Sequence, residues 1–86
     1  MSLFQRKIIK EYEKQGFIVL KTIRLNKSGF PDLQCLKNGK VKFIECKEKK
    51  DILSELQKLR IDQLINKGFE AFCIQDEKGI IYPIKK

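Results

Sequence analysis

The sequence predicts a small α/β domain of the α+β type, and three observations carry that prediction. Two Ser-x-x-Gln motifs each precede an apolar pattern of helical spacing. Several runs rich in β-branched and aromatic residues have the length of strands. The Asn38-Gly39 pair, a strong signal for a tight turn, separates two of these runs. The elements follow the order α-β-β-β-α-β plus a short C-terminal strand, and 86 residues give a single domain over residues 1–86.

The first helix is bounded by a capping motif and a glycine. Ser2 and Gln5 form a capping box, which predicts a helix over residues 2–15 that ends before Gly16. The apolar residues of this segment share one helical face: Phe4, Ile8, Ile9 and Tyr12.

The second helix has the same kind of start. Ser54 and Gln57 form a second capping box, which predicts a helix over residues 55–67 that ends at Gly68. Its apolar residues spread over more than one narrow stripe, which leaves apolar surface for a partner: Leu56, Leu59, Ile61, Leu64 and Ile65.

The strands are predicted from apolar, β-branched runs between turn residues. An Asn-Gly turn of type I′ joins two of these runs as a hairpin, because both of its residues take positive φ. The predicted strands cover residues 17–25, 31–36, 41–47, 69–75 and 80–84.

Charge and hydropathy narrow the function classes. Nineteen Lys and Arg residues against eleven Asp and Glu residues give a net charge of +8, which implies an anionic partner, usually nucleic acid. No apolar run approaches the roughly 20 residues that span a bilayer. The N-terminal segment lacks the apolar core of a signal peptide, so we expect a cytoplasmic protein.

The chain contains no His, which removes Ser-His-Asp and Cys-His catalysis and zinc sites with His ligands. Metal chemistry then rests on carboxylates, which favour hard ions such as Mg²⁺ or Mn²⁺. Cys35, Cys46 and Cys73 sit in strand-like runs without a C-x-x-C motif. We expect them to be reduced, buried side chains rather than disulfide partners or zinc ligands.

The tight turn fixes the hairpin register, and the register places two acids together. With a two-residue loop, Lys37 pairs with Lys40, and Asp32 then falls opposite Glu45 on the same sheet face. Lys47 lies two residues beyond Glu45 and projects to that face too. Adjacent carboxylates repel, and a divalent cation offsets the repulsion. Alternatively, Lys47 neutralises the acids in a salt bridge without a metal.

This cluster has a specific chemical use. A metal held by Asp32 and Glu45 would polarise a phosphodiester and lower the pKa of a bound water. Lys47 can orient that water, help to deprotonate it or stabilise charge on the phosphorus. The pattern therefore predicts metal-assisted phosphodiester hydrolysis with these three residues in catalysis.

Three segments resemble, in order, the PD-(D/E)XK nuclease superfamily and within it the VRR-NUC family of virus-type replication-repair nucleases: Gly29-Phe30-Pro31-Asp32, Phe43-Ile44-Glu45-Cys46-Lys47 and Leu53-Ser54 to Gln57. The resemblance includes small stand-alone phage proteins. It implies a restriction-endonuclease-like αβββαβ core with a mixed sheet. It also implies a divalent-metal-dependent DNA endonuclease working in a bacterial cell or a phage-infected host.

The resemblance also implies roles for individual residues. The two acids would bind Mg²⁺ or Mn²⁺ together with the backbone carbonyl of Cys46, and Lys47 would act on the attacking water. Gln57 matches a motif glutamine of the family and is counted with the catalytic residues. Similar Holliday-junction resolvases carry a metal-assisting Glu on the first helix, where this chain has Gln5, a neutral candidate ligand.

Residues around the predicted site are candidates for DNA contact. Four lie in loops, and one lies at a helix N-terminus, which favours phosphate binding. Basic and aromatic residues are not interleaved in the sequence, so we do not expect sequence-specific readout of the DNA bases. The candidates are Lys27, Ser28, Lys49, Lys50 and Ser54.

Symmetric cutting of two strands needs two active sites, so we expect a homodimer. The resemblance to two-site resolvases adds weight and favours branched, Holliday-junction-like DNA as the substrate. One alternative function is a non-catalytic, basic nucleic-acid-binding module on the same fold. Another is a structural protein whose acid pair forms a salt bridge with Lys47.

Overall fold

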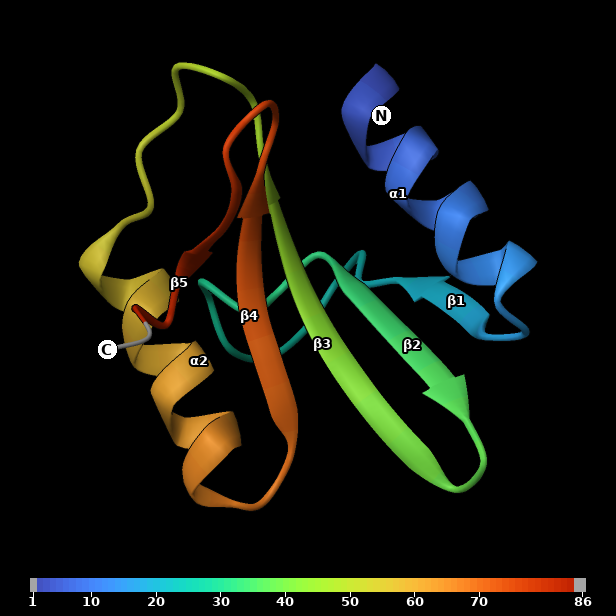
Figure 1. Cartoon of the computed structure of the whole chain (residues 1–86). Coiled ribbons are helices and arrows are strands. Elements are labelled where there is room, and N and C mark those ends of the chain that lie inside the picture. The colour runs from blue at the N-terminus through green and yellow to red at the C-terminus, as the bar shows by residue number, and fades with distance from the viewer. Residues whose placement is uncertain (1, 85–86) are drawn as a thin grey trace.

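The structure, a computed structural model, describes residues 2–84. Its elements are α1 (Leu3–Lys14), β1 (Ile18–Lys21), β2 (Leu33–Lys37), β3 (Lys40–Lys47), α2 (Glu55–Asn66), β4 (Glu70–Gln75) and β5 (Gly79–Tyr82) (Figure 1). The α-β-β-β-α-β order with an extra C-terminal strand is confirmed. None of the described helices is long and apolar enough to cross a membrane.

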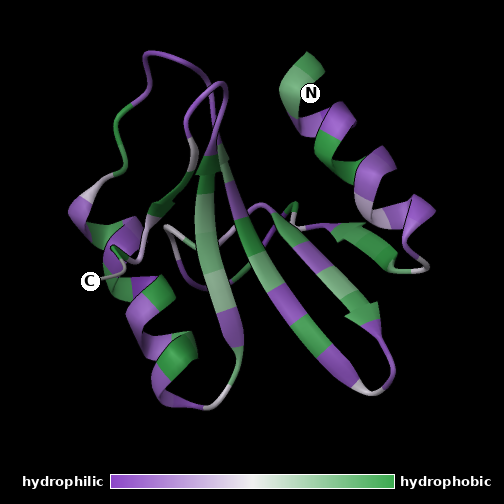
Figure 2. Ribbon diagram, viewed as in Figure 1, coloured by the Kyte–Doolittle hydropathy of each residue, from purple (hydrophilic) through white to green (hydrophobic). Residues whose placement is uncertain are grey.

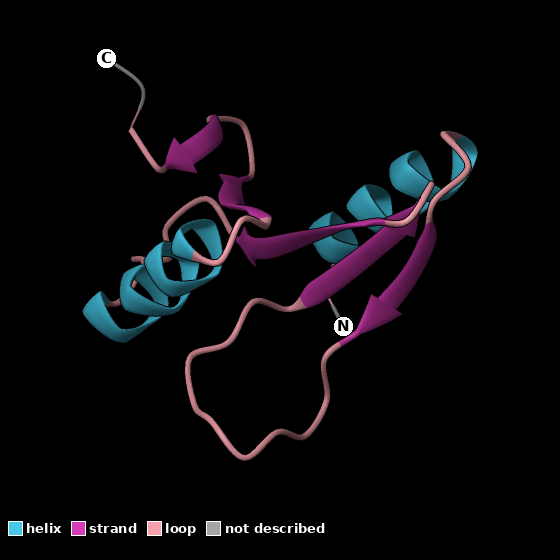
Figure 3. Cartoon of the chain, turned by 90° about the horizontal axis from the view of Figure 1, so that it is seen from below, coloured by secondary structure: helices cyan, strands magenta, loops and turns pink. Residues whose placement is uncertain are grey.

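The five strands form one mixed sheet in the order β1-β2-β3-β4-β5. The central pair, β3 and β4, is parallel, and the remaining neighbours are antiparallel. Since parallel neighbours need a long crossover, α2 connects β3 to β4. Figure 3 shows the two helices on opposite sides of the sheet, with the long β1–β2 loop on the side of α2.

Each helix closes one apolar layer against the sheet. The α1 layer contains Phe4, Ile8, Leu33, Cys35, Ile44 and Phe72. The α2 layer contains Phe43, Leu53, Ile61, Ala71 and Cys73. Figure 2 shows β4 as hydrophobic along most of its length, as expected for a strand covered on both faces. Because side chains alternate along β3, Ile44 faces α1, whereas Phe43 and Glu45 face α2.

The hairpin forms with the predicted register. Asn38 and Gly39 have φ angles of 54° and 73°, and Lys37 pairs with Lys40 across a two-residue loop. All three cysteines are free. Cys35 and Cys73 are buried as predicted, whereas Cys46 is only partly buried.

The β2 strand begins two residues later than predicted, at Leu33 instead of Pro31. Proline has no N–H, so Pro31 cannot donate to Cys46, its partner in this register. The Cys46 N–H instead donates to the side chain of Asp32, at 3.1 Å. The β2–β3 ladder therefore stops at the pair of Leu33 and Ile44.

The strand predicted over residues 17–25 ends at Lys21. Beyond one further hydrogen bond, from the Thr22 N–H to the Asp32 carbonyl at 2.7 Å, the chain leaves the sheet. The loop that follows has a long-range contact: Arg60 on α2 donates to the Ser28 carbonyl at 2.9 Å and ties the β1–β2 loop to α2.

Two predictions at the chain ends also need correction. The last strand, predicted over residues 80–84, ends at Tyr82, because Pro83 follows and cannot donate to a ladder. At α1 only half of the capping box forms: the Ser2 hydroxyl accepts from the Gln5 N–H at 3.0 Å, without a return bond from the Gln5 side chain.

Candidate active site

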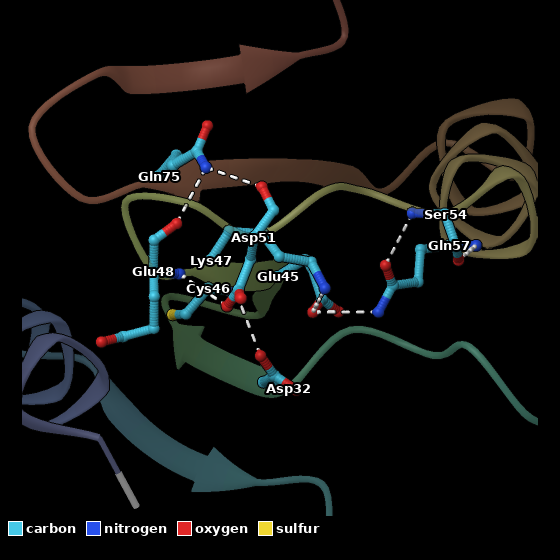
Figure 4. Close-up of polar contacts among 9 residues, drawn as sticks. All are labelled: Asp32, Glu45, Cys46, Lys47, Glu48, Asp51, Ser54, Gln57 and Gln75. Carbon is cyan, nitrogen blue, oxygen red and sulfur yellow. Dashed lines mark hydrogen bonds and ion pairs between the residues drawn. The ribbon is translucent and has the colours of Figure 1, made fainter.

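The two predicted acids meet at the open end of the hairpin, on the sheet face that α2 covers. Glu45 lies near the end of β3 and is 3% exposed. Asp32 is the residue just before β2, so it lies one position beyond Leu33 and Ile44, the last pair of the β2–β3 ladder. The register continues past that pair, so the two carboxyl groups come together as the sequence predicted (Figure 4).

Local backbone chemistry anchors Asp32 and leaves one carbonyl oxygen without a partner in the β2–β3 ladder. In the hairpin register Cys46 would pair with Pro31, which has no N–H to give. The Cys46 N–H donates to Asp32 Oδ2 at 3.1 Å and fixes that carboxylate. The Cys46 carbonyl is left without its partner in the β2–β3 ladder, next to Asp32, where the family resemblance placed a ligand.

Two donors approach Glu45 from different elements. Lys47, two residues along β3, places Nζ 3.7 Å from Glu45 Oε2, and its side chain is 14% exposed. Gln57, on the first turn of α2, donates from Nε2 to the same oxygen at 3.3 Å. The strand and the helix thus hold one buried carboxyl group between them (Figure 4).

Gln57 combines two roles that the sequence suggested separately. Its Oε1 accepts from the Ser54 N–H at 2.9 Å, and its own N–H donates to the Ser54 hydroxyl at 3.1 Å. This reciprocal pair is the predicted capping box. Because the amide oxygen is used by the cap, the amide nitrogen is turned towards Glu45, so the helix start sets the orientation of a site residue.

Without a cation in addition to Lys47, the charged form of Glu45 is unfavourable beside Asp32. Burial, reinforced by the neighbouring Asp32 carboxyl, raises the pKa of Glu45 from 4.5 to about 8. Lys47 lowers that pKa but does not outweigh burial. A salt bridge with Lys47 alone therefore leaves Glu45 largely protonated at neutral pH, and a divalent cation would restore the carboxylate.

The donor set fits Mg²⁺ or Mn²⁺. Asp32, Glu45 and the Cys46 carbonyl supply oxygen atoms, which hard divalent cations prefer. Within residues 2–84, His, Cys, Asp and Glu side chains form no group of three or more that could hold a metal. The site thus offers two acidic side chains, which suits an ion that keeps several of its waters.

Gln5 is not brought to this cluster by any contact among the described residues. It lies on α1, whose buried Phe4 and Ile8 pack against the opposite face of the sheet from Glu45. The capping motif that located the helix does not specify which sheet face the helix covers. Gln5 as a metal ligand stays a prediction.

The predicted DNA-binding residues surround the acids in three segments. Lys27 and Ser28 are exposed in the β1–β2 loop, which Arg60 ties to α2. Lys49 is exposed, and its ammonium pairs with Glu77 at 3.1 Å. The two remaining candidates are Lys50, exposed in the loop after β3, and Ser54, the N-cap of α2.

Sequence reasoning missed Arg60 and Gln75. Gln75 is the last residue of β4, is 5% exposed and lies opposite Lys47 in the parallel ladder. A glutamine that closes an apolar strand was the available signal. Its partners depend on the β3–β4 register, and no local turn fixes that register.

Comparisons with known proteins agree with this architecture. The model of the VRR-NUC domain family matches residues 2–75. A solved structure described as a VRR_NUC domain has a TM-score of 0.71 and 25% identity, over 81% of this chain and 77% of that one. No curated protein sequence matches the chain.

A second solved structure shares the fold. Hjc, a Holliday junction resolvase from the archaeal hyperthermophile Archaeoglobus fulgidus, has a TM-score of 0.64 and 24% identity, over 84% of this chain. The match spans 64% of the length of the resolvase, so this chain accounts for less than two thirds of that protein. The shared fold is the restriction-endonuclease-like one that the family resemblance implied, and the observed element order agrees with it.

Proposed function

The chain belongs to the VRR-NUC domain family, and on that premise we propose that it is a divalent-metal-dependent DNA endonuclease. It would use Mg²⁺ or Mn²⁺ to hydrolyse phosphodiester bonds of branched DNA, as a homodimer in the cytoplasm of a bacterial cell or a phage-infected host. One observation carries the proposal: Glu45 is buried beside Asp32 and has a pKa of about 8, an arrangement that a bound cation would stabilise.

The chain's own side chains divide the work around the ion. A bound metal supplies Lewis-acid activation of a phosphate oxygen and of a water. Asp32, Glu45 and the Cys46 carbonyl would hold it, while the Cys46 N–H fixes Asp32 and Gln57 fixes Glu45. The Lys47 ammonium, poised beside Glu45, orients the attacking water and stabilises negative charge developing on the phosphate.

The proposed substrate is supported by charge and by analogy. A net charge of +8 attracts the phosphate backbone. Hjc, whose fold this chain shares, is a Holliday junction resolvase. Branched DNA is therefore the substrate class we assign, without base-specific readout.

The proposed homodimer is supported by exposed apolar side chains that a second copy would bury. They occur on α2 at Leu56, Leu59 and Ile65, and on β1 at Ile18 and Leu20. Sedimentation velocity across a concentration series tests this part of the proposal. A species of twice the chain mass is expected, and a monomer at every concentration contradicts it.

The activity is tested with a panel of four-way junction, flap, duplex and single-stranded DNA in Mg²⁺, Mn²⁺ or EDTA. We expect metal-dependent nicking, greatest on the branched substrates. Asp32→Asn and Glu45→Gln should abolish it, whereas Glu13→Gln, an exposed acid on α1, matches their charge change and should not.

The other outcomes identify the alternative functions. Salt-dependent DNA binding without cleavage in either metal would make the protein a non-catalytic binding module. Failure of both metal and DNA to raise the melting temperature would leave the acids and Lys47 as a structural ion pair.

A further inference from the structure

A buried amide organises the loop that follows β3. Gln75 ends β4, pairs with Lys47 in the parallel ladder and shares with it the sheet face that carries Glu45. Its side chain is buried, with the residue 5% exposed. The loop that follows β3 leads to α2, and Figure 4 shows the Gln75 side chain directed at Glu48 and Asp51 of this loop.

The Gln75 amide binds this loop through main-chain oxygen atoms. Nε2 donates to the carbonyls of Glu48 and Asp51 at 2.8 Å each, with a longer contact to the Lys49 carbonyl at 3.2 Å. Breaking these bonds would leave a buried polar group unpaired, which is unfavourable. The amide therefore holds the backbone in one conformation.

The loop closes on itself over Gln75 as a four-residue turn, residues 48–51. The Glu48 N–H donates to Asp51 Oδ2 at 3.0 Å, and the Asp51 N–H donates to the Glu48 carbonyl at 3.1 Å. The Asp76 N–H donates to the Lys47 carbonyl at 2.9 Å and joins the base of the turn to β4. The turn is thus fixed from inside by Gln75 and from outside by Asp51.

The two lysines of this turn differ in what they contact. Lys49 is held by Glu77 at 3.1 Å. Lys50 is exposed and has no ion pair among residues 2–84. The turn therefore presents the Lys50 ammonium three residues from Lys47, on a backbone that is already ordered before any ligand binds.

We infer that Gln75 is a positioning residue for DNA binding, which fixes the 48–51 turn so that Lys50 contacts the phosphate backbone beside the active site. An ordered turn lowers the entropic cost of that contact, because the main chain need not be immobilised on binding. The inference rests on the proposed function for its ligand. Beyond that function, the inference names Lys50 as the residue that contacts phosphate and Gln75 as the buried side chain that positions it.

The test is DNA binding in EDTA, where no cleavage occurs, with a four-way junction and a duplex over a range of salt concentrations. One lost phosphate contact makes the negative slope of log K against log salt less steep by about 0.9, which corresponds to roughly eightfold in affinity at 0.1 M salt. Lys50→Ala should show this loss. Lys67→Ala, an exposed lysine at the far end of α2, should keep the parent slope.

Gln75→Met removes the amide and keeps the length of the side chain. It should reproduce the affinity and salt slope of Lys50→Ala, and the double variant should bind no more weakly than either single variant. Hydrogen exchange at the Asp51 amide should accelerate in Gln75→Met. A merely structural role would lower the melting temperature and leave the salt slope unchanged, and that result overturns the inference.

A second variant covers the case in which Gln75→Met does not fold. Asp51→Ala opens the same turn from the solvent side, and it removes a negative charge, which by itself would strengthen DNA binding. Weaker binding with a reduced slope supports the inference, and parent-like or tighter binding contradicts it. Because no arm measures cleavage, an inactive parent would refute the nuclease proposal while this test still decides the role of Gln75.

Discussion

The two ends of the β2–β3 hairpin present the same problem in two environments. At the closed end, Lys37 and Lys40 lie directly opposite each other. At the open end, Asp32 and Glu45 do so one residue beyond the ladder. Each is a pair of like charges across two strands, which destabilises a sheet unless something compensates it.

The closed end is compensated within the chain. Lys40 is exposed to solvent, and Lys37 donates to the Gln15 carbonyl at the end of α1 and lies over the Phe17 ring. At the open end Glu45 is buried, and Lys47 does not restore its ordinary pKa. The contrast indicates that burial of the open end creates the need for a ligand, and the ligand that the donor atoms fit is a divalent cation.

The largest effect should come from neutralising either acid at the open end. Asp32→Asn and Glu45→Gln each remove a proposed metal ligand and should lower the cleavage rate by about a thousandfold or more, since metal activation contributes several kcal/mol. Lys40→Met at the closed end should stay within about twofold of the parent. The rates of all three variants are measured by single-turnover cleavage of a labelled junction. Equal losses of rate at the two ends would contradict the contrast between the open and the closed end of the hairpin.

Lys47 should matter next. Lys47→Met keeps much of the side-chain volume, removes the ammonium beside Glu45 and should lower the single-turnover rate by roughly a hundredfold, as for a group that assists proton transfer. Metal binding, measured by calorimetry, should persist in this variant, because Asp32 and Glu45 remain. Loss of metal binding in this variant would instead mean that Lys47 is needed to bind the metal.

The pKa of Glu45 predicts how pH acts on the metal-free protein. The folded state holds this proton up to about pH 8, whereas the unfolded chain releases it near 4.5. The contribution of Glu45 to stability is therefore complete below pH 4.5 and is lost as pH rises towards 8. In EDTA, the melting temperature of Glu45→Gln relative to the parent should rise over this interval and then level off. A difference independent of pH would contradict the assignment.

Gln57 allows its cap and its site contact to be separated. Gln57→Glu keeps an acceptor for the Ser54 N–H, so the helix start should survive, but it replaces the donor to Glu45 with another acid. Cleavage should fall by about tenfold with little change in melting temperature in Mg²⁺. Gln57→Leu should lose both the capping contact with Ser54 and the contact with Glu45. The fall in its melting temperature therefore measures what the cap contributes.

The smallest effect on activity should come from the turn itself. Gly39 has φ of 73°, so Gly39→Ala should destabilise the protein by about 1 kcal/mol. The register is also set by the buried faces of both strands, so cleavage at full folding should remain within about twofold. Denaturant unfolding and junction cleavage together check this, and loss of activity without loss of stability would mean that the turn alone holds the acids in place.

The sequence was most informative where one local signal determined a distant contact. The Asn38-Gly39 turn sets a two-strand register, and that register alone predicts the meeting of Asp32 and Glu45. The capping motif at Ser54 likewise located Gln57 at the start of α2. Both features depend on chemistry within a few residues of the turn or the cap.

The remaining contacts depend on packing between elements far apart in the chain. The register of β3 with β4 is set by the docking of α2, so the pairing of Lys47 with Gln75 has no local signal. The bond from Arg60 to the Ser28 carbonyl, which ties the β1–β2 loop to α2, joins residues 32 apart. The position of Gln5 relative to the acids has no local signal either, because helix periodicity does not determine which sheet face α1 covers.

The most direct test of the account is a crystal soaked in Mn²⁺, with the ion located by its anomalous scattering. We expect one ion whose protein ligands are the carboxylates of Asp32 and Glu45 and the backbone oxygen of Cys46. Anomalous density elsewhere only, with Glu45 still bound to Lys47 and Gln57 at a saturating concentration of Mn²⁺, would contradict it.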